Sequence, residues 1–418
     1  MSEIYKEMGN AGLFADSFAL MGDMYMVFYA DEGGMGMRSS MEILGDKRDL
    51  AGVFPGVDGE VSLVDKVNGT GMIMYMEQAG MGTAFGAVMD YYANLFAYGY
   101  NAGASYQLDD PYAFPTDDAD VTATDSEKSF DLFDSSVLET SILDDSVIEE
   151  PGFVGTVIER PDLQSASLYE EILAAVAEMA DISVDEVKEI LDSPMALAFS
   201  DNGSLVPTFS IYFEIDEDLT AQAKQLAGAL DDWMSEFVGE FEDSLLTGFG
   251  VPVEGALKKD VVLVNGGGVH RIYLDWSVLP EEAMAGFAMP GLDFEDLSLE
   301  FYYGLTGDNV FVIGFEPNFE QNFGKNALAD SERYKEAVSK VEDSYGYTVN
   351  FFDVQPLIGL IDRYVELARV AKAISASEIA QYDKVMAFVR RFEYMISAGK
   401  LDGDVMRSDF YLAIGDGE

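Results

Sequence analysis

Apolar residues recur along this chain with two periods, and the longer period predicts helices. Spacings of three and four residues gather apolar side chains on one helical face. Ser183, followed three residues later by Glu186, forms a capping box that starts one such helix. The predicted helices are at residues 83–96, 168–179, 183–191, 218–238, 331–341 and 357–371. In the longest, the residues expected to face inward are Leu219, Ala223, Leu226, Leu230, Trp233, Met234, Phe237 and Val238.

Shorter apolar runs, bounded by Gly, Asn and Asp, predict strands. Asn265-Gly266 lies between two such runs and favours the tight turn of a β-hairpin. Residues 306–309 and 401–404 separate two further pairs of runs in the same way. The predicted strands are at residues 24–29, 69–77, 153–158, 195–199, 208–215, 261–264, 269–276, 297–303, 309–315, 347–353, 391–397 and 405–414.

The order of these elements predicts an α+β fold of two related units, each an antiparallel sheet packed with helices. Both units contain a strand, a helix, further helical sequence and a strand pair. We expect an N-terminal strand-containing segment at 1–68, a first unit at 69–260 and a second at 261–418. An acidic insertion at about 101–164 interrupts the first unit. Its Asp, Ser, Thr and Pro content is typical of a loop that buries little.

Negative charge dominates the composition. The 418 residues include 77 Asp and Glu against 24 Lys and Arg, a formal net charge of −53. Such a chain repels polyanions, which excludes nucleic acids and anionic membrane surfaces as partners. Three interpretations of the acidity remain open: a high-salt medium that screens charge, divalent cations that neutralise carboxylates, or simple solubility.

Absent residue types exclude several chemistries. The chain has no cysteine and one histidine, His270. Thiolate metal sites, cysteine nucleophiles and multi-histidine metal sites within one chain are therefore excluded. No apolar run reaches the length of a membrane span. The first residues lack the layout of a signal peptide. The chain is therefore either cytoplasmic, or begins after a removed export signal.

Two glycine-rich segments have the context of binding loops, but simpler interpretations fit them better. Residues 80–86 follow a predicted strand and open a helix, yet their spacing differs from the dinucleotide fingerprint. Residues 266–268 could form an anion-binding nest, but the flanking strands favour a hairpin tip. We expect His270, beside this tip, to be structural. Motifs of serine hydrolases, P-loop proteins and zinc proteases are missing.

Calcium is the one cofactor that the sequence suggests. Several aspartates in the acidic insertion offer hard oxygen ligands on a loop, although no complete calcium-binding loop motif is present. The candidate metal ligands are Asp109, Asp110, Asp117, Asp118, Asp120 and Asp125.

Three stretches carry a family resemblance. They are residues 189–215, which run from Glu189 through Pro194 to Ile215; residues 327–338, which include Leu328-Ala329-Asp330-Ser331; and the turn at 401–404. Over about 165–414 the chain resembles an uncharacterised group of bacterial envelope proteins that usually carry an N-terminal membrane or lipoprotein anchor. The resemblance implies an exported location and a non-enzymatic role, and it supplies no catalytic residues.

These observations favour a non-enzymatic envelope or surface protein that acts as a structural or interaction module, adapted to high salt or divalent cations. Its expected location is extracytoplasmic, with the cytoplasm of a salt-accumulating organism as the alternative. Expected partners are other envelope proteins, a second copy, or monovalent and divalent cations. Two other functions remain open: a ligand-binding protein with a cleft between the two α+β units, and a hydrolase that uses paired carboxylates.

Overall fold

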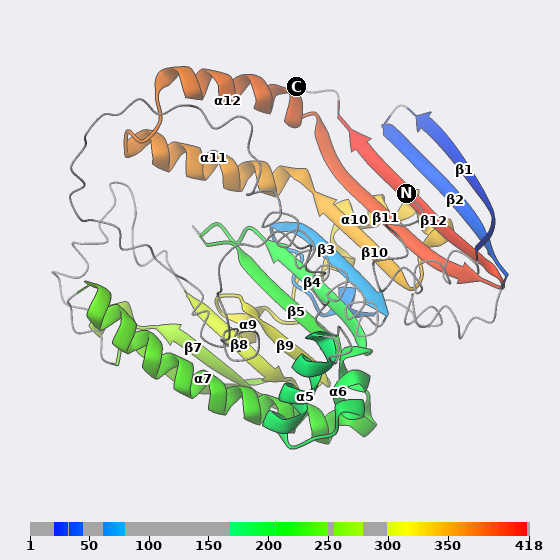
Figure 1. Ribbon diagram of the computed structural model, residues 1–418. Coiled ribbons are helices and arrows are strands. Elements are labelled where there is room, and N and C mark those ends of the chain that lie inside the picture. The colour runs from blue at the N-terminus through cyan, green and yellow to red at the C-terminus, as the bar shows by residue number, and fades with distance from the viewer. Residues whose placement is uncertain are drawn as a thin grey trace, which may run out of the picture. The chain divides into compact units, whose positions relative to one another are not determined.

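The computed structural model describes residues 21–31, 33–44, 62–79, 168–204, 206–249, 255–278 and 299–415, which form one sheet with helices (Figure 1). Neighbouring strands are antiparallel throughout, in the order β1-β2-β12-β11-β10-β3-β4-β5-β9-β8-β7-β6. The strands are β1 (Met21–Asp31), β2 (Gly34–Ile43), β3 (Met72–Ala79), β4 (Pro194–Ser200), β5 (Thr208–Glu214), β6 (Leu257–Val264), β7 (Gly267–Leu274), β8 (Glu300–Leu305), β9 (Val310–Phe315), β10 (Thr348–Asp353), β11 (Phe392–Asp402) and β12 (Val405–Ile414).

Helices and single 3-10 turns connect these strands and confirm the α+β class. The helices described are α5 (Leu168–Ala180), α6 (Val184–Leu191), α7 (Thr220–Phe249), α9 (Phe319–Asn322), α10 (Glu332–Lys340), α11 (Val354–Val370) and α12 (Ala376–Val389). The turns used below are η1 (Leu63–Asp65) and η6 (Leu328–Asp330). Within the described ranges, no helix is long and apolar enough to cross a bilayer.

The antiparallel pair β3 and β10 lies near the middle of the sheet. β4 and β5 follow on the β3 side, whereas β11 and β12 follow on the β10 side. The strands β3, β4 and β5 of the first predicted unit and β10, β11 and β12 of the second therefore have the same order outward from the β3–β10 pair. The duplication itself stays a prediction. The expected boundary at 260/261 falls inside β6, and β6 to β9 extend the sheet beyond β5.

The register divides the side chains between two faces of the sheet. On face A, Tyr75, Tyr212 and Phe351 join a core with η1, α9, η6 and α10. On face B, Phe213 and Phe311 pack against α6 and α7. Farther along face B, Val354, Ile358 and Met386 of α11 and α12 pack with Phe352 and Phe392. The two faces are thus covered by different helices.

The structure confirms two predictions made from short sequence motifs, the capping box at Ser183 and the hairpin turn at Asn265-Gly266. Ser183 Oγ accepts from the Glu186 backbone N–H and the Glu186 side chain accepts from the Ser183 N–H, which confirms the capping box. Asn265 and Gly266 have φ values of 51° and 91°, as a tight hairpin turn requires, and they connect β6 to β7. This confirms that residues 266–268 belong to a hairpin.

One prediction about α7 is wrong. Trp233 and Phe237 were expected to face inward, but they are 52% and 45% exposed and stack on each other with ring centroids 5.9 Å apart. Within the part of α7 whose side chains are described, residues 220–239, the buried residues are Ala223, Ala227, Ala229 and Met234. The predicted helix at 83–96, the strand at 153–158 and the insertion at 101–164 lie outside the described residues.

Candidate functional site

A polar pocket on face A, which contains a buried carboxyl group, is the candidate site. It has a volume of about 260 Å³ and lies over β4 and β5. One wall comes from the segment that leads into β3, and the other from the segment between β9 and η6. The lining residues are Val67, Asn68, Thr70, Ala198, Ser200, Asn202, Thr208, Ser210, Tyr212, Glu316, Pro317, Asn322 and Asn326.

Among the described lining residues, Glu316 alone has a carboxyl group, and it is only 9% exposed. The Tyr212 hydroxyl donates to Glu316 Oε2 at 3.1 Å, and Ser210 Oγ makes a longer contact at 3.5 Å. These partners lie on β5, whereas Glu316 follows the last residue of β9. The pairing of β5 with β9 therefore assembles the group.

A glycine on β9 makes room for this arrangement. Gly314 lies opposite Ser210 in the register, and a Cβ at Gly314 would lie 2.5 Å from Ser210 Oγ. The same Cβ would lie 2.5 Å from the Phe209 carbonyl oxygen and 2.6 Å from Ser210 Cα, so any larger residue would force β5 and β9 apart. The neighbouring strands can therefore place a serine, a tyrosine and a glutamate around one point.

Burial changes the chemistry of Glu316. It raises the pKa of this carboxyl to about 7, although hydrogen bonds from Tyr212, Ser210 and Asn322 partly oppose the rise. Burial, together with the nearby Glu316 charge, holds the pKa of Tyr212 well above its usual value. Near neutral pH the tyrosine thus keeps its proton and donates a hydrogen bond, and Glu316 is divided between its acid and carboxylate forms.

A second buried glutamate shows what a structural carboxylate looks like in this fold. Glu77 is 1% exposed and accepts from the Leu63 N–H at 2.7 Å, the Ser62 N–H at 2.5 Å and the Tyr75 hydroxyl at 2.5 Å. Both of its carboxylate oxygens therefore accept hydrogen bonds, two of them from backbone N–H groups at the start of η1. Glu316 differs because its neighbours are side chains around a cavity.

The remaining polar lining is neutral. It consists of the amides of Asn68, Asn202, Asn322 and Asn326 and of serine and threonine hydroxyls. Among the described residues that line the pocket there is no Lys, Arg or His. An anionic ligand would therefore find no counter-charge, whereas a cation would find one carboxylate.

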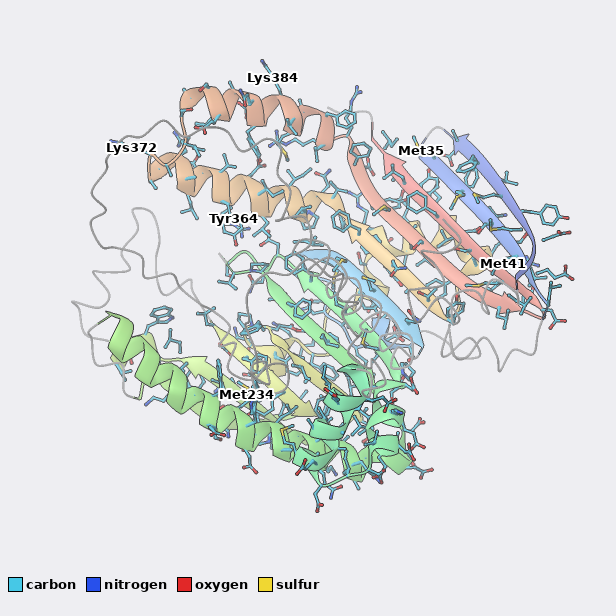
Figure 2. All side chains as sticks on the ribbon, viewed as in Figure 1. Met35, Met41, Met234, Tyr364, Lys372 and Lys384 are labelled. Atoms are coloured by element: carbon cyan, nitrogen blue, oxygen red, sulfur yellow. The ribbon has the colours of Figure 1, made fainter. Side chains whose placement is uncertain are left out.

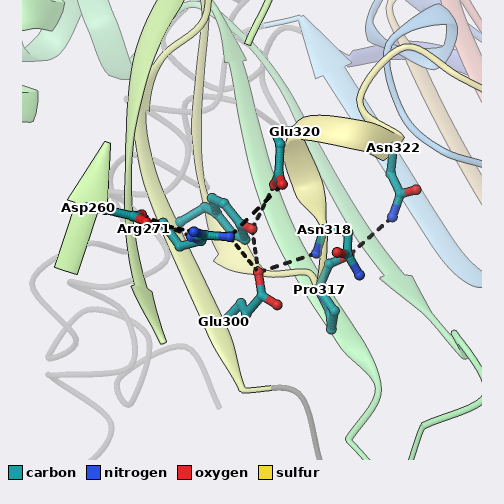
Figure 3. Close-up of polar contacts among 8 residues, drawn as sticks. Asp260, Arg271, Glu300, Pro317, Asn318, Glu320 and Asn322 are labelled. Carbon is teal, nitrogen blue, oxygen red and sulfur yellow. Dashed lines mark hydrogen bonds and ion pairs between the residues drawn. The ribbon is translucent and has the colours of Figure 1, made fainter. Parts of the chain in front are cut away.

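An ion-pair network holds the α9 wall (Figure 3). Arg271 of β7 binds Asp260 through two hydrogen bonds of 2.9 and 2.6 Å, and its Nη1 lies 3.7 Å from Glu300 Oε2. The Asn318 N–H donates to the same Glu300 oxygen at 3.4 Å. Glu320 of α9 accepts from the Tyr302 hydroxyl at 2.9 Å. These contacts fix the start of α9, which bears Asn322.

A second ion pair holds the opposite rim. Arg363 of α11 binds both carboxylate oxygens of Asp201 at 2.9 and 2.8 Å, and it also contacts the Ser204 carbonyl. Asp201 precedes Asn202, which lines the pocket. Because α11 lies on face B, the contact ties the turn between β4 and β5 to the opposite layer.

No match to the chain was found among known family models, curated proteins or solved structures. The resemblance to envelope proteins therefore stays an expectation from the sequence.

The candidate calcium ligands Asp109, Asp110, Asp117, Asp118, Asp120 and Asp125 lie outside the described residues, as does the glycine-rich segment 80–86. In the ranges that the structure describes, no three Asp, Glu or His side chains form a metal-binding group. Calcium binding therefore stays a prediction.

His270 lies away from the pocket, on face B. Its ring stacks on Tyr303 with centroids 5.1 Å apart, and Nδ1 lies 2.5 Å from Asp231 Oδ1. Burial would raise the pKa of Asp231, but hydrogen bonds from Lys259 and Tyr303 and the nearby His270 lower it overall. The histidine thus joins a network that secures α7 to the sheet.

Sequence reasoning missed Glu316. With 77 acidic residues in the chain, a single glutamate after an apolar strand carries no distinguishing signal. The partners of Glu316 are about a hundred positions away, since Tyr212 is 104 residues from it in the chain.

Proposed function

We propose that this protein is a binding protein whose pocket at Glu316 holds a small ligand bearing an ammonium group. The observation that supports this proposal most directly is the buried carboxyl group of Glu316, which faces a cavity whose other polar lining is neutral. A buried carboxylate is stabilised when an opposite charge joins it, and a ligand ammonium would supply that charge. The volume of about 260 Å³ suits a molecule of about ten non-hydrogen atoms.

The lining supports binding rather than hydrolysis by paired carboxylates. A carboxylate-based hydrolase needs two acids at a set separation, one to donate a proton and one to act as base or nucleophile. The described lining holds only Glu316. It includes residues from both sequence ranges expected to form α+β units, 69–260 and 261–418, and this favours the ligand-binding alternative.

The acidic composition indicates the ionic environment in which this function would take place. With a net charge of −53, the fold should depend on screening or bridging cations. We therefore keep the proposal that the protein works outside the cytoplasm, in the cell envelope or at the surface, in a medium rich in salt or divalent cations. The cytoplasm of a salt-accumulating organism would supply the same conditions.

Isothermal titration calorimetry with 1,4-diaminobutane and its neutral counterpart 1,4-butanediol tests the proposed pocket. The diamine should bind more tightly than the diol. Because Glu316 has a pKa of about 7, the affinity for the diamine should rise about tenfold from pH 6 to pH 8 at constant ionic strength.

Two matched variants complete this experiment. Glu316→Gln should abolish diamine binding, whereas Glu332→Gln, at an exposed position on α10 outside the lining, should leave it nearly unchanged. Equal binding of diamine and diol would overturn the charge assignment. Diamine binding that survives in Glu316→Gln would overturn the site.

A further inference from the structure

The outermost strand β1 carries an uninterrupted run of exposed apolar side chains. Met24, Tyr25, Met26, Val27 and Phe28 are 46 to 74% exposed. Consecutive residues of a strand point to opposite faces, so β1 is apolar on both faces at once. Within the described residues, β1 pairs only with β2, which leaves its other edge without a strand. Figure 2 shows this hairpin, with Met35 and Met41 labelled on β2.

The opposite edge of the sheet is protected differently. β6 begins with Leu257-Lys258-Lys259-Asp260, and charged side chains on an edge strand discourage pairing with another chain. Lys259 and Asp260 are also held in ion pairs with Asp231 and Arg271. β1 has no charged residue between Asp23 and Asp31. A long, uncharged, apolar edge is the type that associates with another strand.

The sequence of β1 is self-complementary in an antiparallel pairing. A two-fold axis through Met26 would place Met26 opposite its own copy, Met24 opposite Phe28 and Tyr25 opposite Val27. Apolar side chains would then meet on both faces of the joined sheet. The same register keeps Asp23 away from Asp31, so it places no like charges directly opposite each other.

The area available is enough for a dimer contact. At roughly 200 Å² for a large side chain, the exposed parts of the five residues amount to about 600 Å² per copy, or up to about 1,200 Å² for a pair. This is near the lower limit for stable protein interfaces. Main-chain hydrogen bonds along the strand would add to the apolar contact.

We propose that β1 is a dimerisation edge, at which two copies of the chain join their sheets through antiparallel β1–β1 pairing. The net charge of −53 on each copy opposes this contact at low ionic strength. At about 1 M salt the Debye length falls to about 3 Å, which removes most of that repulsion. Dimerisation should therefore strengthen with salt.

Sedimentation velocity over a range of protein concentrations, at 0.05 and 1 M NaCl, tests the proposal. The wild-type chain should dimerise at high salt and dissociate at low salt. Val27→Glu should weaken the dimer at least about tenfold, because two carboxylates would enter the contact. Leu263→Glu is the matched control, since Leu263 is 74% exposed on the opposite edge strand. It should dimerise as the wild type does.

The absence of native cysteine allows a direct test of the register. Met26→Cys should form a disulfide-linked dimer on mild oxidation, because the register places the two side chains opposite each other. Ala380→Cys, at an exposed position on α12, should stay monomeric under the same conditions. A wild-type chain that remains monomeric at every salt and protein concentration would overturn the proposal. So would equal weakening by Val27→Glu and Leu263→Glu, or equal crosslinking of the two cysteine variants.

Discussion

The hydroxyl of Tyr212 donates a hydrogen bond to Oε2 of Glu316, 3.1 Å away, across the boundary between β5 and the end of β9. Both residues are buried, and burial raises the pKa of each. The pKa of the glutamate is raised to about 7, so Glu316 changes charge near neutral pH while the tyrosine keeps its proton. The pair thus gives the pocket a pH-dependent charge.

This charge should appear in the pH dependence of stability. The pKa of Glu316 is about 7 in the fold, against 4.5 ordinarily. Between these values the folded state holds a proton that the unfolded state has lost, so stability falls as pH rises through this window. Glu316→Gln removes the effect. It should be more stable than the wild type by about 3 kcal/mol at pH 8 and by little near pH 5.

Urea denaturation of both proteins at several pH values measures this difference. Glu332→Gln, which changes an exposed glutamate, should follow the wild-type pH profile. A constant difference between Glu316→Gln and the wild type would show that Glu316 titrates normally.

Arg271 should be important for the α9 wall. Arg271→Met would leave Asp260, Glu300 and Glu320 without their shared cation. Since the guanidinium is partly exposed, we expect a loss of about 2 kcal/mol in the free energy of unfolding, less than for a fully buried pair. Arg369→Met, which removes an exposed pair with Glu366, should change stability little. Similar losses from both substitutions would contradict the network.

Arg363 should hold the turn between β4 and β5. Arg363→Met removes two hydrogen bonds to Asp201 and one to the Ser204 carbonyl. Hydrogen exchange of amides at residues 200–204 should become faster, because the turn loses its link to α11. Arg390→Met breaks an ion pair between the C-terminal end of α12 and Asp362 of α11. It is the control and should leave amide exchange in this turn unchanged. Unchanged exchange in Arg363→Met would mean that the strands alone order the turn.

Counterions should govern the stability of the whole fold. Raising NaCl from 20 mM to 1 M should raise the melting temperature by at least about 5 °C, because screening weakens repulsion among the carboxylates. Calcium chloride at matched ionic strength should raise it further if divalent cations bridge carboxylates. A melting temperature indifferent to salt and to chelator would contradict the proposed cation-rich setting.

Most elements could be predicted from the sequence because they depend on neighbours in the chain. The capping box at Ser183 and the turn at Asn265-Gly266 are examples, since each needs only a few adjacent residues. The strand β2 was not predicted. Its Gly, Ser and Met residues have little intrinsic preference for strand, and its place depends on pairing with β12, more than 360 residues later.

The candidate site could not be predicted for a related reason. Glu316 becomes special only when β9 pairs with β5 and the segment around Asn322 closes over it. Trp233 and Phe237 show a similar limit. They follow the helical period of α7, but the helix meets the sheet through a narrower stripe around Met234. Periodicity predicts a face of a helix, and packing decides how wide that face is.

The position of β2 affects how the chain can reach its native state. β2 pairs with β12, more than 360 residues later, so β2 lacks one of its two neighbours until β12 has been synthesised. Such distant pairings require closure of very long loops and slow the search for the native topology. During synthesis, the hairpin of β1 and β2, with its exposed apolar run, therefore stays unattached to the rest of the sheet until β12 has been made. We expect chaperones that shield nascent apolar segments to be most important for this chain at that stage.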